Sequence, residues 1–178
     1  MTNELIVNIK DSIREIPDFP KKGILFLDIT TALKDPAVLK TIIDQLTEKF
    51  KNEKIDYVAG IESRGFMFGV PLAYNLNAGF VPIRKPNKLP AETLKESYSL
   101  EYGTDTIEIH ADALEEGSNV LVVDDLLATG GTANAACNLI HKAGANIVST
   151  AFLIELTDLN GREKLEDKGI NTYSMLQY

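Results

Sequence analysis

Residues 120–132 read Val-Leu-Val-Val-Asp-Asp-Leu-Leu-Ala-Thr-Gly-Gly-Thr, and this run indicates the architecture of the chain. Its first four residues are apolar and three of them are valine, which is typical of a short buried strand. The carboxylates of Asp124 and Asp125 are expected where that strand ends. A loop of small residues, Ala128–Thr132, then leads into an alanine-rich helix. Backbone N–H groups at such a loop and helix N-terminus bind phosphate.

The acidic pair beside this anion site constrains the ligand. Phosphate alone would be repelled by Asp124 and Asp125. The ligand is therefore expected to carry a phosphate together with sugar hydroxyls, a cation or developing positive charge. Ligands of open α/β sheets bind at the carboxyl ends of the strands, which is where the sequence places both groups.

Length and composition predict one domain over residues 1–178. The net charge of −8 argues against a nucleic-acid surface, which would need a basic patch. No apolar stretch approaches the length of a membrane span. Cys137 is the single cysteine, so no internal disulfide can form, and this fits a reducing compartment. The chain is expected to be soluble and cytoplasmic, without nucleic-acid or membrane partners.

Strand and helix patterns alternate along most of the chain, which predicts a parallel sheet covered on both faces by helices. Apolar spacing at the N-terminus predicts a helix over residues 3–15. Asp35-Pro36 is a helix-start signal for a helix through about residue 51. The remaining expected elements are strands over 56–61, 80–83, 119–123 and 146–155, and helices over 66–75 and 132–143.

The region between the two strand–helix units differs from the rest of the chain. Residues 85–96 are polar and interrupted by proline, which predicts an exposed, mobile loop. Residues 97–101 and 106–110 alternate like strands around Tyr102-Gly103-Thr104-Asp105, which is a hairpin signal.

Basic residues follow two of the predicted strands. Arg64 lies in the loop 62–65, Arg84 and Lys85 end the strand over 80–83, and Lys88 comes shortly after. Because strand ends of a parallel sheet share one edge, these side chains are expected to converge near Asp124. A local basic cluster in an acidic protein suits a pyrophosphate group. For Lys88, ordinary surface charge is an equal alternative.

The run from Val120 to Thr132 resembles the phosphoribosyl-pyrophosphate signature of the type I phosphoribosyltransferases. The resemblance implies that Asp124 and Asp125 bind the ribose hydroxyls of 5-phosphoribosyl-1-pyrophosphate (PRPP). It implies a mainly parallel, twisted sheet flanked by helices, with a small N-terminal hood in residues 1–35 and a mobile active-site loop and hairpin at 85–102. It also implies a non-proline cis peptide between Glu62 and Ser63. The residues implied to wrap the 5-phosphate are Ala128, Thr129, Gly130, Gly131 and Thr132.

Within the family, the resemblance is to members that use adenine, and it covers roughly residues 12–157. It is carried by the segments 18–30, 60–66, 81–86, 88–90 and 97–103. It implies that the hood residues Leu25, Phe26 and Leu27 hold adenine, largely through backbone groups. Leu27 departs from the pattern, because these members commonly have arginine there, and lower affinity is expected if that arginine orients base or phosphate.

The implied reaction is adenine plus PRPP giving AMP and pyrophosphate, a step of purine salvage. Glu101 is implied to be the general acid/base beside the purine, and Mg²⁺ to be held mainly by substrate and water. The same resemblance implies a homodimer with residues 66–70 at its interface. The residues implied to face pyrophosphate are Glu62, Ser63, Arg64, Arg84, Lys85, Lys88 and Tyr102.

Three other readings share part of this pattern. A phosphoribosyltransferase for another base would use the same Asp124–Thr132 chemistry. A non-catalytic PRPP-binding regulator would need a nucleic-acid surface, which the charge opposes. A PRPP synthetase would need an ATP site, for which the sequence offers no candidate segment.

Overall fold

A computed structural model describes residues 9–99 and 103–178 of the chain. The chain divides into two compact units, Met1–Lys49 and Phe50–Tyr178. Among the described residues, no helix is long and apolar enough to cross a membrane.

The second unit is built on a parallel five-stranded sheet with the strand order β4-β3-β7-β8-β9. The predicted parallel sheet is thus confirmed, and its central strand is the valine-rich segment that the sequence indicated. The strands are β3 (Tyr57–Ile61), β4 (Gly79–Ile83), β7 (Asn119–Leu127), β8 (Asn146–Glu155) and β9 (Thr172–Gln177).

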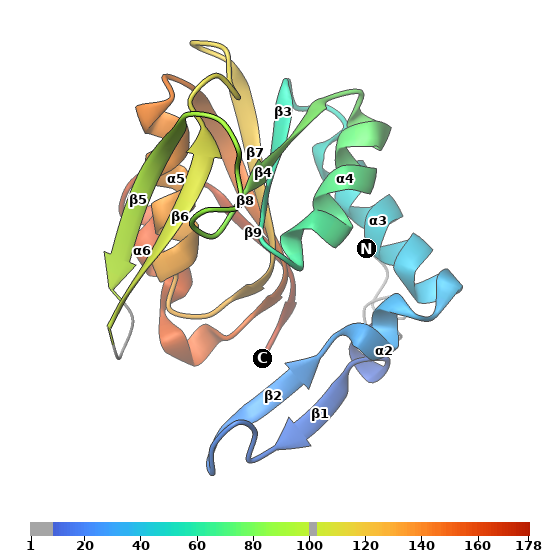
Figure 1. Cartoon of the computed structure of the whole chain (residues 1–178). Helices are drawn as coiled ribbons and strands as arrows, with labels where there is room; N and C mark the ends of the chain where they lie inside the picture. Colours follow the sequence, from blue (N-terminus) through green and yellow to red (C-terminus); the bar gives the residue numbers. More distant parts are fainter. Residues whose placement is uncertain (1–8, 100–102) are drawn as a thin grey trace. The chain divides into compact units, whose positions relative to one another are not determined.

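Helices cover both faces of this sheet, as Figure 1 shows. The helix α4 (Gly65–Leu76) connects β3 to β4, and α5 (Gly131–Lys142) connects β7 to β8. The two connections run in opposite directions across the sheet, so right-handed crossovers place the helices on opposite faces. A 3₁₀ turn (Thr157–Leu159) and the short helix α6 (Gly161–Glu166) lead from β8 to β9 on the α5 side.

The core of this unit lies between the sheet and its helices. The four residues Val120–Val123 of β7 are at most 1% exposed. Phe68 and Leu72 of α4 and Leu139 of α5 are fully buried. Removing this apolar surface from water supplies the main stabilising free energy and fixes β7 at the centre of the unit.

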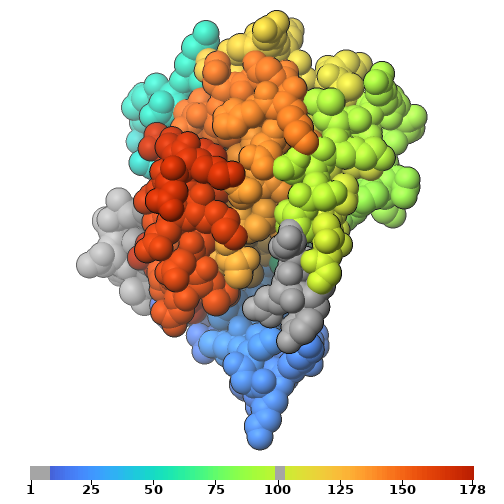
Figure 2. All heavy atoms as spheres, turned by 90° about the vertical axis from the view of Figure 1, so that its left-hand side faces the viewer, coloured from blue at the N-terminus to red at the C-terminus, as the bar shows by residue number. Residues whose placement is uncertain are grey.

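An antiparallel hairpin made of β5 (Thr93–Ser99) and β6 (Thr104–His110) packs beside α5, as the space-filling view shows (Figure 2). Arg84 joins the hairpin to the end of β4, because its N–H donates to Glu108 O at 2.9 Å and Glu108 N–H donates back at 2.8 Å. The predicted hairpin is confirmed, but the predicted loop of residues 85–96 is too long, because β5 already begins at Thr93.

The first unit contains an antiparallel pair, β1 (Arg14–Pro17) and β2 (Leu25–Asp28), followed by α2 (Thr30–Leu33) and the start of α3 (Pro36–Phe50). Arg14 Nη2 pairs with Asp28 Oδ2 at 2.6 Å across the two strands. Hydrogen bonds from Thr30, followed by those from Arg14, lower the pKa of Asp28 to about 2. The charged form of Asp28 therefore ties β1, β2 and the start of α2 together.

Two predicted elements need correction. The helix predicted over residues 3–15 is wrong at its end, because residues 9–11 are helical but β1 begins at Arg14; its first part lies outside the described residues. The strand predicted over 119–123 continues to Leu127, so Asp124 and Asp125 lie within β7 rather than after it. Pairing with the long strand β8 explains this extension, because Leu126 and Leu127 lie opposite Ile154 and Glu155.

Candidate functional site

A cavity of about 230 Å³ opens where β3 and β7 approach their carboxyl ends. Its lining residues are Ile61, Glu62, Ser63, Arg64, Lys85, Tyr98, Asp124, Asp125 and Thr132. A second cavity of about 90 Å³ is lined by the small-residue loop, and it shares Asp124 and Thr132 with the first. The two cavities therefore adjoin along the acidic end of β7.

The register of β3 against β7 creates this arrangement. Gly60 lies opposite Val123, so the loop after Ile61 and the carboxylates after Val123 come to the same edge. Gly65 lets α4 start there, because a Cβ on Gly65 would lie 2.6 Å from the carbonyl oxygen of Val123. A larger residue at this position would separate the two loops.

Arg64 and Asp125 form the ion pair that joins the two loops. Arg64 Nε donates to Asp125 Oδ2 at 2.5 Å, and only 8% of the Asp125 side chain is exposed. The Arg64 side chain is 44% exposed, so it borders the cavity while it neutralises a buried carboxylate. Such a charge-assisted contact fixes the loop geometry more firmly than an exposed ion pair would.

Asp124 has a different environment from its neighbour. Its Oδ1 accepts a hydrogen bond from the backbone N–H of Asp125 at 2.9 Å. Burial, reinforced by the Asp125 carboxylate, raises the pKa of Asp124 well above its ordinary value. Of the two carboxylates, Asp124 is therefore the one whose charged form is stabilised more by a ligand that carries hydroxyl donors or positive charge.

Glu62 holds the loop after β3 to the end of β4. The peptide between Glu62 and Ser63 is cis, which confirms the prediction made by resemblance. Arg84 donates to Glu62 through Nε at 3.0 Å and Nη2 at 3.3 Å, and the N–H of Lys85 donates at 2.8 Å. The guanidinium of Arg84 also lies 5.9 Å from the centre of the Phe66 ring. Arg84 therefore braces the loop, and it does not line the cavity.

Lys85 lines the cavity and is held by two residues that sequence reasoning missed. Its ammonium group pairs with Asp105, and Tyr98 Oη donates to the same carboxylate at 3.1 Å. Tyr98 and Asp105 face each other across β5 and β6 in the hairpin register. The sequence carries one signal for this pair. The alternation of side chains along both strands of the hairpin places Tyr98 and Asp105 on the same face.

The small-residue loop enters α5 through Gly130, which has a left-handed conformation with φ of 73°. Residues in the first turn of a helix have N–H groups without intrahelical partners, and the first turn of α5 lines the smaller cavity. Together, the loop and the adjoining Asp124 provide hydrogen-bond donors for a phosphate next to an acceptor for hydroxyl groups.

Most of the predicted site residues of the second unit come together here. Lys88 is exposed and does not line either cavity, although its charge contributes to lowering the pKa of Glu62. Glu101 and Tyr102 lie outside the described residues. The predicted adenine-binding residues Leu25, Phe26 and Leu27 lie in β2 of the first unit. The ring of Phe26 packs edge-on against the ring of Phe19, with 5.2 Å between the ring centres.

Comparisons with known proteins point to one family. The family model of the phosphoribosyl transferase domain matches residues 29–177. A protein of Thermosynechococcus vestitus named adenine phosphoribosyltransferase is 60% identical over 166 residues, which cover 93% of this chain and 98% of that protein. The crystal structure of adenine phosphoribosyltransferase from Thermoanaerobacter pseudethanolicus is 53% identical, with a TM-score of 0.93 over 97% of this chain and 99% of that one. The Saccharomyces cerevisiae enzyme, solved with adenine and an imino-altritol bisphosphate, is 42% identical, with a TM-score of 0.91 over 97% and 99%.

The ion pair of Glu62 predicts a specific dependence of stability on pH. Hydrogen bonds from Arg84, which outweigh the effect of burial, hold the pKa of Glu62 below its ordinary value of 4.5. Because a lowered pKa favours the charged folded form, Glu62 stabilises the fold above about pH 4.5 and loses this effect as the pH falls through its folded pKa. Urea unfolding of wild type and Glu62→Gln should show wild type as the more stable at about pH 7, and this difference should shrink towards about pH 3. A difference that is independent of pH would contradict the assigned ion pair.

Proposed function

Since this chain belongs to the phosphoribosyl transferase family, we propose that its two adjoining cavities carry out the transfer for which its relatives are named. The chain transfers the 5-phosphoribosyl group of PRPP to adenine, and the products are AMP and pyrophosphate. The observation that carries the assignment of the site is the register of β3 and β7, which sets Arg64 and Asp125 beside Asp124 and the small-residue loop.

The carboxylates bind the ribose. Asp124 and Asp125 accept hydrogen bonds from its 2′- and 3′-hydroxyls. The sugar becomes cationic as the bond to pyrophosphate breaks, by analogy with other glycosyl transfers. Negative charge beside it then stabilises the transition state more than the ground state. The raised pKa of Asp124 supports this role, because its charged form lacks stabilisation until the ligand supplies it.

The loop Ala128–Thr132 anchors the 5-phosphate. Its backbone N–H groups and the positive end of the α5 dipole attract the anion without a cationic side chain. The smaller cavity lined by this loop adjoins Asp124, as required if one ribose 5-phosphate spans both.

The larger cavity receives the pyrophosphate. Arg64 and Lys85 provide its positive charge, and Ser63 is available as a hydrogen-bond donor. The carboxylates of Asp124 and Asp125 are oxygen ligands of the kind that Mg²⁺ prefers. Among the described residues, no group of three or more His, Cys, Asp or Glu side chains is arranged to hold a metal ion. When bound, Mg²⁺ neutralises charge on the departing pyrophosphate.

Adenine is held by the hood residues Leu25, Phe26 and Leu27, and Glu101 exchanges the purine proton. A backbone carbonyl of this hood would accept from the 6-amino group of adenine and repel the 6-oxo group of hypoxanthine. The segment 85–92 and the hairpin limit access of water, which would otherwise hydrolyse PRPP.

The protein acts as a homodimer in the cytoplasm. Met67, Val70 and Tyr74 form an apolar stripe on α4 and are 48%, 50% and 85% exposed. Their spacing places them on one helix face, and exposed apolar patches of this kind mark protein interfaces. Sedimentation of wild type as a dimer, and of Val70→Asp as a monomer, is the expected result; a monomeric wild type would contradict it.

Turnover with a panel of bases tests the function. Purified protein with PRPP and Mg²⁺ should convert adenine, and should use hypoxanthine, guanine and orotate very poorly. Glu101→Gln, assayed in parallel, should keep the preference for adenine while kcat falls by about 10²-fold, a typical contribution of general acid–base catalysis. Comparable rates with hypoxanthine would contradict the hood assignment, and an unchanged kcat in Glu101→Gln would remove Glu101 from the mechanism.

A further inference from the structure

The small-residue loop packs against a glycine that the reaction does not otherwise use. A Cβ on Gly161 would lie 2.9 Å from the backbone nitrogen of Gly130 and would overlap the carbonyl oxygen of Ala128. A Cβ on Gly130 would in turn lie 2.8 Å from the carbonyl oxygen of Gly161. The first residue of α6 and the loop at the start of α5 are therefore in direct backbone contact, with no room for a side chain between them.

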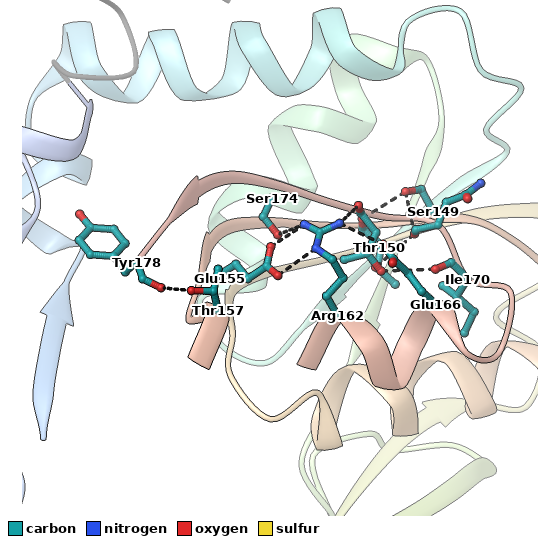
Figure 3. A network of polar contacts seen from close by, with 11 residues as sticks. Ser149, Thr150, Glu155, Thr157, Arg162, Glu166, Ile170, Ser174 and Tyr178 are labelled. Atoms are coloured by element: carbon teal, nitrogen blue, oxygen red, sulfur yellow. Dashed lines mark hydrogen bonds and ion pairs between the residues drawn. The ribbon is translucent and has the colours of Figure 1, made fainter. Parts of the chain in front are cut away.

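Arg162, the next residue, ties α6 to the sheet (Figure 3). Its Nε and Nη2 donate to the two carboxylate oxygens of Glu155 at 2.9 and 2.5 Å. Its Nη1 donates to the carbonyl oxygen of Thr172 at 2.6 Å, and Nη2 lies 3.3 Å from Ser174 Oγ. The Glu155 side chain is 5% exposed, so this two-pronged pair is formed largely away from water.

Glu155 lies at the point where β7 leads into the loop. It is the last residue of β8 and lies opposite Leu127, the last residue of β7. The next backbone N–H, that of Leu156, donates to Leu127 O at 2.9 Å. Arg162 is therefore anchored to Glu155, which pairs with the last residue of β7 before the small-residue loop begins. Gly161 contacts that loop directly after this pair, at Ala128 and Gly130.

We propose that Arg162 is a positioning residue for the 5-phosphate loop, acting through Gly161; this inference rests on the proposed phosphate-binding role of Ala128–Thr132. The planar fork of arginine fixes the direction of the start of α6 relative to β8, which a lysine ammonium cannot do. Gly161 then limits where Ala128 and Gly130 can lie. The backbone N–H groups keep the geometry that the phosphate needs, and small displacements of such groups are costly in rate.

Gly161→Ala tests the contact directly. The added methyl group should displace the loop and lower kcat/KM for PRPP by about 10²-fold. In calorimetric titrations, affinity for AMP, which carries the 5-phosphate, should fall, while affinity for pyrophosphate should stay within about twofold, since pyrophosphate binds at the Arg64 loop.

Gly169→Ala is the matched control. Gly169 lies after α6 with φ of 74°, and a Cβ at this position would meet no atom within 4 Å beyond its chain neighbours. Its substitution therefore strains the backbone without touching the loop. It should lower the melting temperature while leaving both affinities unchanged. Equal losses for AMP and pyrophosphate in Gly161→Ala, or a loss for AMP in Gly169→Ala, would overturn the proposal.

If Gly161→Ala does not fold, Arg162→Lys provides a second test of the positioning role. It keeps the positive charge beside Glu155 and removes the fork, so KM for PRPP should rise about two- to thirtyfold with a smaller change in kcat. Glu166→Gln removes only an exposed partner of Arg162, at 3.1 Å from Nη1, and should leave KM unchanged. An unchanged KM for PRPP in Arg162→Lys would overturn the proposal. Absence of turnover in wild type would instead contradict the proposed function itself.

Discussion

The parallel pairing of β3 with β7 is the constraint on which the rest of the site depends. It places the loop after Ile61 beside the carboxylates after Val123, and the Arg64–Asp125 ion pair then joins the two segments. Buried valines fix β7 at the centre of the sheet, so the position of the acidic pair follows from the packing of the core. A shift of one residue in this register would exchange the faces of the sheet on which Asp124 and Asp125 lie.

Charge compensation organises the rim of the larger cavity. Arg64 pairs with Asp125, Arg84 with Glu62, and Lys85 with Asp105. In a chain with a net charge of −8, these ion pairs allow three basic side chains to lie close together without forming a basic surface. A polyanionic ligand would compete with Asp105 for Lys85, whereas Arg84 stays with Glu62 as part of the frame. The basic cluster expected from the sequence is thus divided between binding groups and a brace.

The segments with strong periodicity and clear end signals could be predicted from the sequence. The strand β8 occupies the predicted residues 146–155, and α5 lies within one residue of its predicted start. Elements that depend on distant partners were not found. The helix predicted over residues 3–15 extends into β1 because the apolar residues there have helical spacing, but pairing with β2 makes residues 14–17 extended. The six-residue helix α6 was missed because it is too short to show a period.

The residues of the candidate site also differ in how well they could be predicted from the sequence. The ordered combination of strand, acidic pair and small-residue loop predicts that Asp124, Asp125 and residues 128–132 lie together, and the structure places them along two adjoining cavities. The partners that orient them left weak signals. Asp105 is one acidic residue in a hairpin, and Gly161 gains its importance only from a backbone contact with Ala128 and Gly130, far from it in the sequence. Such contacts arise from tertiary packing, which no local pattern encodes.

The most direct test of this account is the steady-state kinetics of Asp124→Asn with PRPP and adenine. The amide keeps the size of the side chain and removes the charge beside the developing sugar cation. The variant should fold, and its kcat should fall by about 10²-fold or more, with a smaller change in KM for PRPP. A variant with the kcat of wild type would contradict it, because the acidic end of β7 would then have no part in the transition state.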